Sequence, residues 1–164
     1  MSGAIFHIQP WTIRILEVEQ LLETEIRNTV PELEILFMGA APLGLPGKND
    51  IDLDILCSTK DISHYTKKLT PVLGKPEKIS ADMSIWGFEK DGFEVDCILS
   101  DPVASHVPKQ KSVFELLKAN ADLLEEYRNL KISCDGIPYQ EYEKIKKQFF
   151  TPLGLEKWIR PFWS

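Results

Sequence analysis

Three aspartates, Asp50, Asp52 and Asp54, alternate with aliphatic residues in the first half of the chain. Alternate side chains of a strand point to the same face, so the spacing predicts that the three carboxylates share one face. Like charges this close repel each other by about a few kcal/mol per pair. Carboxylate oxygens are the ligands that suit a hard cation such as Mg²⁺. The pattern therefore predicts a carboxylate metal site, with a solvated or lysine-paired strand edge as the alternative.

A second alternating pair of acids, Glu94 and Asp96, follows the dipeptide Asp91-Gly92. An Asp-Gly pair between two apolar runs is typical of a two-residue β-hairpin turn. If the second hairpin strand lies beside the aspartate strand, Asp96 joins the other carboxylates, and such a set can hold two divalent ions about 4 Å apart. Phosphoryl-type transfer needs little more than that clamp and positioning. The alternative is that Glu94 and Asp96 form the polar outer face of a hairpin.

A loop rich in glycine and proline separates Gly39 from the aspartates. Its backbone N–H groups can form an anion-binding concavity. Lys48, late in this loop, is a candidate phosphate contact, and a solvated lysine is the alternative. We expect the loop to lie at the surface, as connecting segments usually do.

These residues together resemble a known protein family. Gly39-Ala40, the loop and Asp50-Ile51-Asp52-Leu53 are similar to the signature of the nucleotidyltransferase superfamily, which is Gly-Ser or Gly-Gly, a loop, then Asp-hydrophobic-Asp. Within the superfamily the GrpB-like proteins are most similar, through Gly44 to Asp52 and through C-terminal patterns at 114–118, 126–131 and 142–149. The sequence departs from them at Ala40, where the family has serine, and at Glu94-Val95-Asp96, where many members carry His-x-His.

The resemblance implies an α+β, nucleotidyltransferase-like fold and an activity. A nucleoside monophosphate would move from a nucleoside triphosphate to an unidentified hydroxyl acceptor. The catalytic residues it implies are Asp50, Asp52 and Asp96. The metal ligands it implies for Mg²⁺, with Mn²⁺ as the alternative ion, are Asp50, Asp52, Asp54 and Asp96. The substrate-binding residues it implies are Gly39, Ala40 and Lys48. The superfamily and GrpB-like alignments differ in register, and Asp52 is common to both.

Two other functions stay open. One is that the chain keeps the fold as a non-catalytic binding or regulatory module, because Ala40-Ala41 lack the hydroxyl of the usual triphosphate site. The same carboxylates also suit metal-dependent hydrolysis of a phosphate ester. Four further residues match the family pattern, and we expect them to serve helix packing and ion pairs with neighbouring glutamates: Tyr127, Lys131, Tyr142 and Lys146.

The predicted element order places the acids in a small sheet. Apolar periodicity predicts a helix over 10–27, strands over 33–38 and 50–57, and a helix over 61–69 that Pro71 closes. The hairpin strands are predicted over 83–89 and 93–99. Helices follow from 108 onwards, with a capping box at Ser112, a cap at Asn120 and a last helix over 139–150. This order predicts a small mixed β-sheet flanked by helices and a helical C-terminal third, with a tail over 151–164 packed on the body.

Composition bounds the class of protein. The chain of 164 residues fits one nucleotidyltransferase-like domain over 1–164, with a core at about 33–100 and a helical part at about 108–164. The net charge of −6 argues against strong general nucleic-acid binding. No apolar run approaches the ~20 residues of a membrane span, and the N-terminus lacks a signal-peptide pattern. Three cysteines without metal-site spacing favour buried thiols in a reducing cytoplasm. The sequence gives no prediction of the oligomeric state.

Overall fold

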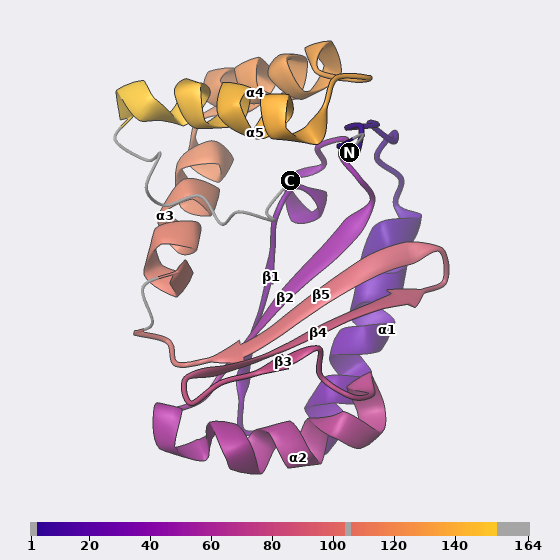
Figure 1. The fold of residues 1–164 in the computed structure, drawn as a ribbon, viewed down its shortest axis with the longest axis vertical. Coiled ribbons are helices and arrows are strands. Elements are labelled where there is room, and N and C mark those ends of the chain that lie inside the picture. Colours follow the sequence, from indigo (N-terminus) through magenta and orange to yellow (C-terminus); the bar gives the residue numbers. More distant parts are fainter. Residues whose placement is uncertain (1–2, 104–105, 154–164) are drawn as a thin grey trace.

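The computed structural model describes residues 3–103 and 106–153. Within these residues, one mixed sheet is built from five strands: β1 (Glu34–Met38), β2 (Asp50–Leu56), β3 (Lys78–Ile79), β4 (Met83–Lys90) and β5 (Phe93–Ser100). Their order across the sheet is β1-β2-β5-β4-β3 (Figure 1). β2 and β5 run parallel, and every other neighbouring pair is antiparallel. The predicted mixed sheet is confirmed, and the short edge strand β3 was not expected.

In the described part of the chain, five α-helices surround this sheet: α1 (Arg14–Thr29), α2 (Ile62–Leu73), α3 (His106–Ala119), α4 (Ala121–Ser133) and α5 (Tyr139–Phe150). Short 3₁₀ turns lie at Ala41–Leu43, Thr59–Asp61 and Thr151–Leu153. α4 begins after Asn120, whose Oδ1 accepts a hydrogen bond from the Leu123 N–H at 3.1 Å. The predicted cap and the predicted last helix are therefore confirmed, as is the α+β layout with a helical C-terminal part.

Three predicted helix boundaries are wrong. The first helix, predicted to begin at Pro10, begins at Arg14. α2 continues through Pro71 and ends before Gly74, whose φ of 84° suits glycine. Pro71 cannot donate to the carbonyl of Lys67, and because Lys67 is exposed that carbonyl can turn to solvent. Ser112 lies inside α3 instead of capping it, and its hydroxyl donates to the Pro108 carbonyl oxygen at 3.0 Å. A capping box alone therefore does not fix a helix start.

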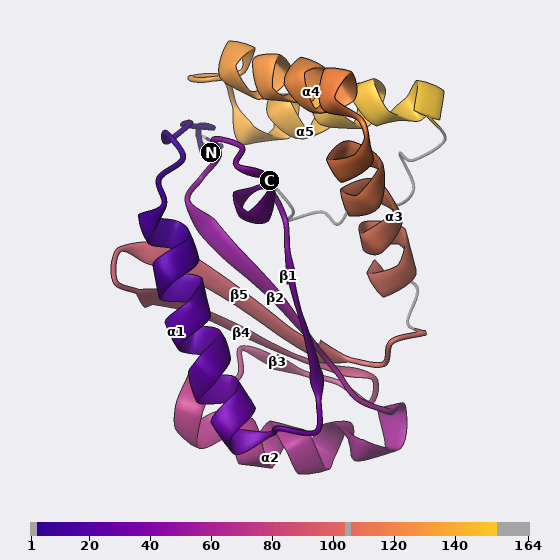
Figure 2. The ribbon, with the colours of Figure 1, turned by 180° about the vertical axis from the view of Figure 1, so that it is seen from behind.

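The main core lies between one face of the sheet and helices α1 and α2. Figure 2 shows α1 running across the sheet, with α2 at its lower end. The strand residues in this core alternate along β2 and β5, and they are Ile51, Leu53, Ile55, Val95, Cys97 and Leu99. Burying each large aliphatic side chain stabilises the fold by about 1.5–3 kcal/mol. Because the apolar residues take this face, the aspartates between them must point to the other.

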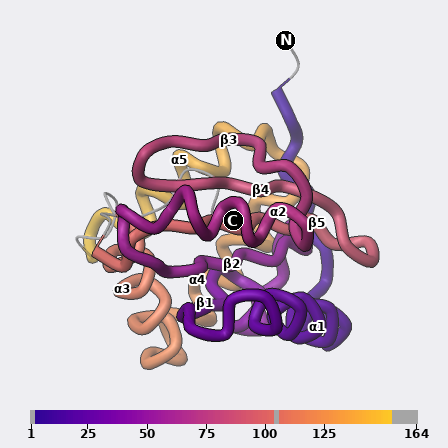
Figure 3. The backbone as a smooth tube through the Cα atoms, turned by 90° about the horizontal axis from the view of Figure 1, so that it is seen from below, coloured from indigo at the N-terminus to yellow at the C-terminus, as the bar shows by residue number. Residues whose placement is uncertain are grey.

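The remaining helices cover the aspartate side. Seen from below in Figure 3, α3 and α1 lie on opposite sides of the sheet. Helices α4 and α5 lie beyond the upper ends of β1 and β2 (Figures 1 and 2). A second apolar cluster joins the loop after β1 to these helices, and it contains Ala40, Leu45, Val113, Leu117, Tyr127 and Phe150. The predicted tail extends into residues 154–164, which lie outside the described part of the chain.

The segment of residues 4–9, here called the N-terminal strap, links α5 to the loop after β1. The Phe6 N–H donates to the Ile137 carbonyl at 2.8 Å, and the Gln9 N–H donates to the Gly47 carbonyl at 2.7 Å. The Phe6 ring stacks on Tyr142 with centroids 3.8 Å apart. The strap therefore holds the C-terminal helices and the loop in one arrangement.

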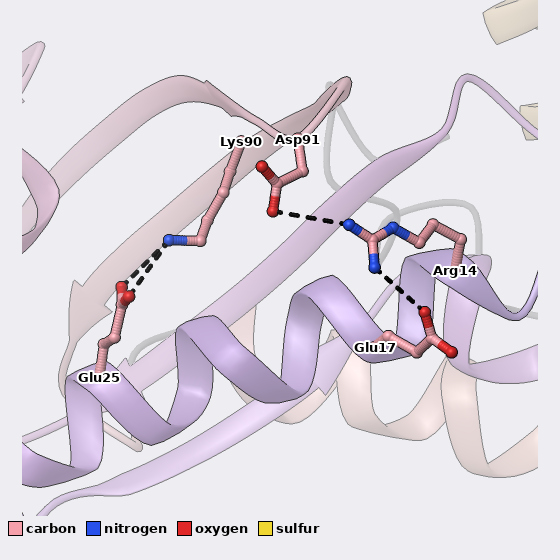
Figure 4. A network of polar contacts seen from close by, with 5 residues as sticks. All are labelled: Arg14, Glu17, Glu25, Lys90 and Asp91. Atoms are coloured by element: carbon pink, nitrogen blue, oxygen red, sulfur yellow. Dashed lines mark hydrogen bonds and ion pairs between the residues drawn. The ribbon is translucent and has the colours of Figure 1, made fainter.

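Ion pairs join α1 to the turn of the β4–β5 hairpin (Figure 4). The Lys90 ammonium lies 3.2 Å from a Glu25 carboxylate oxygen, and the Arg14 guanidinium lies 4.0 Å from Asp91. Asp91 and Gly92 both have positive φ, 50° and 86°, as the predicted two-residue turn requires. Exposed pairs of this kind contribute about 0.2–1 kcal/mol each, so apolar packing does most to position the hairpin.

Among the described residues, no helix has the length and apolar character that a membrane crossing needs. The side chains of Cys57, Cys97 and Cys134 are buried.

Candidate functional site

The centre of the site is a carboxylate triad, formed by Asp50 and Asp52 on β2 and Asp96 on β5. Asp52 and Asp96 are direct partners in the parallel register of these strands. One carboxylate oxygen from each of the three residues lies within 4.8 Å of the other two. The prediction that Asp52 and Asp96 face one site from neighbouring strands is confirmed.

The triad is largely withdrawn from water. Asp50 is 5% exposed, Asp52 is 1% exposed and Asp96 is partly buried. Three carboxylates in so small and dry a space need positive charge beside them, because burying an uncompensated charge costs several kcal/mol. An all-oxygen, anionic ligand set matches Mg²⁺ or Mn²⁺. The residues present therefore fit a divalent cation.

Asp54 shares the face of the triad but has a different neighbour. Its Oδ1 lies 3.8 Å from His106 Nε2, at the start of α3. The same ring nitrogen lies 3.3 Å from the Ser100 hydroxyl oxygen. The structure thus brings Asp54 to His106 and Ser100, and metal binding by Asp54 stays a prediction.

The glycine loop, residues 39–49, connects β1 to the triad. Gly39 has φ 79°, a conformation that favours glycine, and Asn49 adopts φ 63° just before Asp50. The Ala40 carbonyl accepts hydrogen bonds from the N–H groups of Leu43 and Leu45, at 3.1 and 3.2 Å. The Trp11 indole N–H donates to the Ala41 carbonyl at 2.8 Å. Hydrogen bonds within the loop and the hydrogen bond from Trp11 therefore hold the loop in one conformation.

The expectation that this loop lies at the surface is wrong, because every residue of 39–49 is buried or partly buried. Ala40 and Ala41 are only 5% and 4% exposed. The reason is tertiary, because Ala40 and Leu45 pack against Tyr127 of α4 and Phe150 of α5. The C-terminal helices cover the loop that sequence reasoning left open to solvent.

Lys48 lies beside the triad, as its place in the loop suggested. Its ammonium is 4.0 Å from Asp50 Oδ2 and 4.8 Å from the centroid of the Tyr139 ring. The side chain is partly exposed. The contact of Lys48 with a substrate phosphate stays a prediction.

Two buried lysines were missed as parts of the site. Lys131 of α4 and Lys146 of α5 are both fully buried. Lys146 donates to Glu143 at 2.7 Å, the kind of ion pair that the sequence predicted. Lys131 instead points its ammonium towards the glycine loop, where a side-chain carbon built on Gly47 would lie 3.3 Å away. The available signal was the spacing, since each lysine follows a buried tyrosine by four residues on the same helix face.

The charged groups of the triad and of helices α4 and α5 shift the pKa values of one another. Burial lowers the pKa of Lys131 to about 7, and the negative charges of Asp50 and Asp52 oppose that shift. Burial likewise lowers the pKa of Lys146, and its neighbour Glu143 opposes the shift. Burial also raises the pKa of Tyr127 well above its ordinary value. Acids on the strands thus face lysines and phenols on the C-terminal helices.

An open groove of about 340 Å³ borders the triad on its other side. Its lining runs from Asp96 on β5 across β4 and also includes Glu77, Gly87, Phe88, Glu89, Val95 and Glu94. Gly87 is the register partner of Asp96, and a side-chain carbon there would meet the Glu77 carboxylate at 2.8 Å. Only glycine at this position lets Glu77 lie against the strand next to Asp96.

Comparison with known proteins adds evidence on the fold. No protein-family model and no curated protein matches the chain. Among solved structures it is similar to the Cid1 poly(U) polymerase, described as having RNA terminal uridylyl transferase activity, with TM-score 0.50 and 18% identity over 71% of this chain and 40% of that chain. A Cid1 structure with Mg and 3′-dATP bound gives TM-score 0.49 and 17% identity, with the same coverage. The chain spans about two fifths of the length of these polymerases. It therefore has a nucleotidyltransferase-like fold.

Proposed function

We propose that the chain is a metal-dependent nucleotidyltransferase of GrpB-like type. It would transfer a nucleoside monophosphate from a nucleoside triphosphate to a hydroxyl acceptor. The observation that carries the proposal is the carboxylate triad, in which Asp52 and Asp96 are register partners and Asp50 follows the glycine loop. We further propose that residues 1–164 act as one domain, which the packing of the glycine loop against α4 and α5 supports.

Each member of the triad has a role in this reaction. Asp50 and Asp52 would hold Mg²⁺ or Mn²⁺, which supplies charge neutralisation for the phosphates and lowers the pKa of the acceptor hydroxyl. The acceptor oxygen forms a bond to the α-phosphorus, and the bond to the bridging oxygen breaks so that pyrophosphate leaves with the electron pair. Asp96 is partly exposed beside the open groove. In the proposed reaction it would help to hold the metal and would take the acceptor proton.

The loop would bind the polyphosphate. Backbone N–H groups around Gly39 and Ala40 are suited to anionic oxygens in the way that other tight loops are. Lys48 adds a cationic side chain 4.0 Å from Asp50 and is exposed enough to move towards a phosphate. The groove beside Asp96 offers the acceptor an approach from the side away from α4 and α5.

A second candidate is a non-catalytic binding module. Ala40 favours it, because this residue carries no hydroxyl and its methyl group packs into an apolar cluster instead of facing a ligand. Such a module would still bind metal and nucleotide, or another anion, without releasing pyrophosphate. The two candidates therefore differ in whether a bound nucleoside triphosphate is converted with release of pyrophosphate.

The test compares Asp52→Asn with the parent protein. Ligand that binds only the folded state raises its stability by about 2.7 kcal/mol at a hundredfold excess over the dissociation constant. We expect Mn²⁺ with one of the four nucleoside triphosphates to raise the melting temperature of the parent, and Asp52→Asn to lose most of that increase. Asp122→Asn, at an exposed position of α4, is the control and should keep it.

Turnover is followed as pyrophosphate release in the presence of hydroxyl compounds. Release by the parent that disappears in both Asp52→Asn and Asp96→Asn supports the transferase. Metal-dependent nucleotide binding without release would favour the binding module. Equal melting shifts in the parent and Asp52→Asn would show that Asp52 is not a ligand.

A further inference from the structure

Lys131 occupies an unusual place for a lysine. It lies near the end of α4 and is 0% exposed. Its ammonium has no hydrogen-bond acceptor among the described residues, and it lies 5.3 Å from the centroid of the Tyr127 ring. The glycine loop closes over it, because a side-chain carbon at Gly47 would come within 3.3 Å of the ammonium nitrogen. An apolar residue of the same length would fill this space without the cost of burying a charge.

The charged groups around Lys131 show which interactions stabilise a positive charge at this position. Asp50 and Asp52 stabilise its charged form, whereas Lys146 and Lys48 disfavour it. Glu143 accepts a hydrogen bond from the Lys146 ammonium, and the Lys48 ammonium is partly in solvent. The glutamates of its own helix, Glu125 and Glu126, are exposed. The attraction that Lys131 receives therefore comes from Asp50 and Asp52, the two triad members on β2.

We infer that Lys131 is a counter-charge for the carboxylate triad, which weakens binding of a divalent cation alone and favours its binding together with a polyphosphate. In the metal-free protein the ammonium offsets part of the negative charge of Asp50 and Asp52. When a cation enters, it meets the like charge of Lys131. An anionic polyphosphate bound at the same time offsets both positive charges. This inference rests on the proposed metal site and says how that site is loaded.

Coulomb's law sets the direction of the effect. A single ammonium within several ångströms of a divalent ion opposes its binding by an energy that corresponds to about a tenfold change in affinity at the dielectric of bulk water, and to more at the lower dielectric of a partly buried site. Lys131→Met removes the charge and keeps an unbranched side chain of similar length. A role in packing alone would leave metal affinity unchanged, so the affinity for metal separates the two roles.

The experiment measures Mn²⁺ binding to the full chain by calorimetric titration, first with Mn²⁺ alone and then with inorganic tripolyphosphate present. We expect Lys131→Met to bind Mn²⁺ alone at least about tenfold more tightly than the parent. Tripolyphosphate should tighten Mn²⁺ binding to the parent, and should do so several-fold less in Lys131→Met. Lys144→Met, at an exposed position of α5, is the matched control and should behave as the parent. Lys131→Gln is a second uncharged variant and should repeat the result.

The outcomes separate this inference from the proposed function. Equal affinity for Mn²⁺ in the parent and both uncharged variants would overturn the counter-charge and leave the metal site standing. Absence of Mn²⁺ binding in the parent and the variants would overturn both. A variant that folds only when Mn²⁺ is added supports the counter-charge, because the metal then replaces the missing positive charge. Failure of both variants to fold with or without Mn²⁺ would show that Lys131 is needed for packing and would overturn the inference.

Discussion

Ala40 shows how one methyl group limits what the glycine loop can do. Its side chain packs with Leu45 and Tyr127, and only 5% of the residue is exposed. Ala40→Ser would place a hydroxyl in apolar surroundings, which costs about 1–3 kcal/mol when the group finds no partner. We therefore expect a loss of stability of that size in urea unfolding, and no tightening of nucleotide binding.

Ala121→Ser is the control for this substitution. Ala121 is exposed at the start of α4, so the change there should stay within about 0.5 kcal/mol. Unchanged stability in Ala40→Ser, together with tighter nucleotide binding, would contradict the buried position of the side chain and restore the hydroxyl as a phosphate ligand.

The residues of the site differ in how far the sequence alone could place them. The shared face of Asp52 and Asp96 follows from the alternation of side chains along each strand. The Asp91-Gly92 hairpin signal predicts the strand of Asp96, and the parallel pairing of β2 with β5 brings the two residues together. Lys131 could not be predicted in the same way. A helix pattern shows that it shares a face with Tyr127, but only the packing of α4 onto the glycine loop reveals that this face meets the triad.

Among the elements, α1 carries an acid on its buried side. Glu19 is largely buried, and this burial raises the pKa of its carboxyl from 4.5 to about 8, with a further contribution from Glu23 and an opposing one from Arg27. Below pH 4.5 both the folded and unfolded forms are protonated at this residue. As the pH rises towards 8 the unfolded chain ionises first, so the stability of the fold decreases.

Glu19→Gln should therefore stabilise the protein most at alkaline pH. We expect a gain of about 1–3 kcal/mol in the free energy of unfolding at pH 8 and little change at pH 4.5. Urea unfolding across this pH range measures both. Glu17→Gln, an exposed position on the same helix, should show no such pH dependence, and an equal gain in the two variants would contradict the raised pKa.

The elements that the sequence predicted well are those whose ends are fixed locally. Asn120 caps α4 through its own side chain, and the Asp91-Gly92 turn needs only its two positive φ values. The helix boundaries predicted at Ser112 and Pro71 are wrong because α3 and α2 continue through these residues, where packing on the rest of the molecule favours a longer helix. The edge strand β3 has only two residues, too few for a periodic pattern.

At the scale of the whole molecule, the N-terminal strap links parts that are distant in sequence. Phe6 is fully buried and stacks on Tyr142, while Gln9 is hydrogen-bonded to Gly47. Phe6→Ala should reduce stability by about 3–5 kcal/mol, the usual cost of removing a buried ring. It should also weaken Mn²⁺-nucleotide binding, because the strap positions the glycine loop against α5.

Thermal unfolding and calorimetric titration together test this link. Ile5→Ala, on the same strap but with an exposed side chain, should change both quantities far less. A Phe6→Ala protein that is destabilised yet binds Mn²⁺-nucleotide as tightly as the parent would show that the strap supports the fold without positioning the site.

The hydrogen bond from Trp11 to Ala41 gives the site an optical reporter. Indole emission responds to changes in the polarity and hydrogen bonding around the ring, and this indole is bonded to the glycine loop itself. Trp86 is almost fully buried, and its indole N–H donates a hydrogen bond to the Gly74 carbonyl at the end of α2. Its emission should therefore stay constant when the loop binds a phosphate. Loading of the site could thus be followed in real time without a label. Trp11→Phe would remove the part of the emission change that comes from this indole, while Trp86→Phe would preserve it.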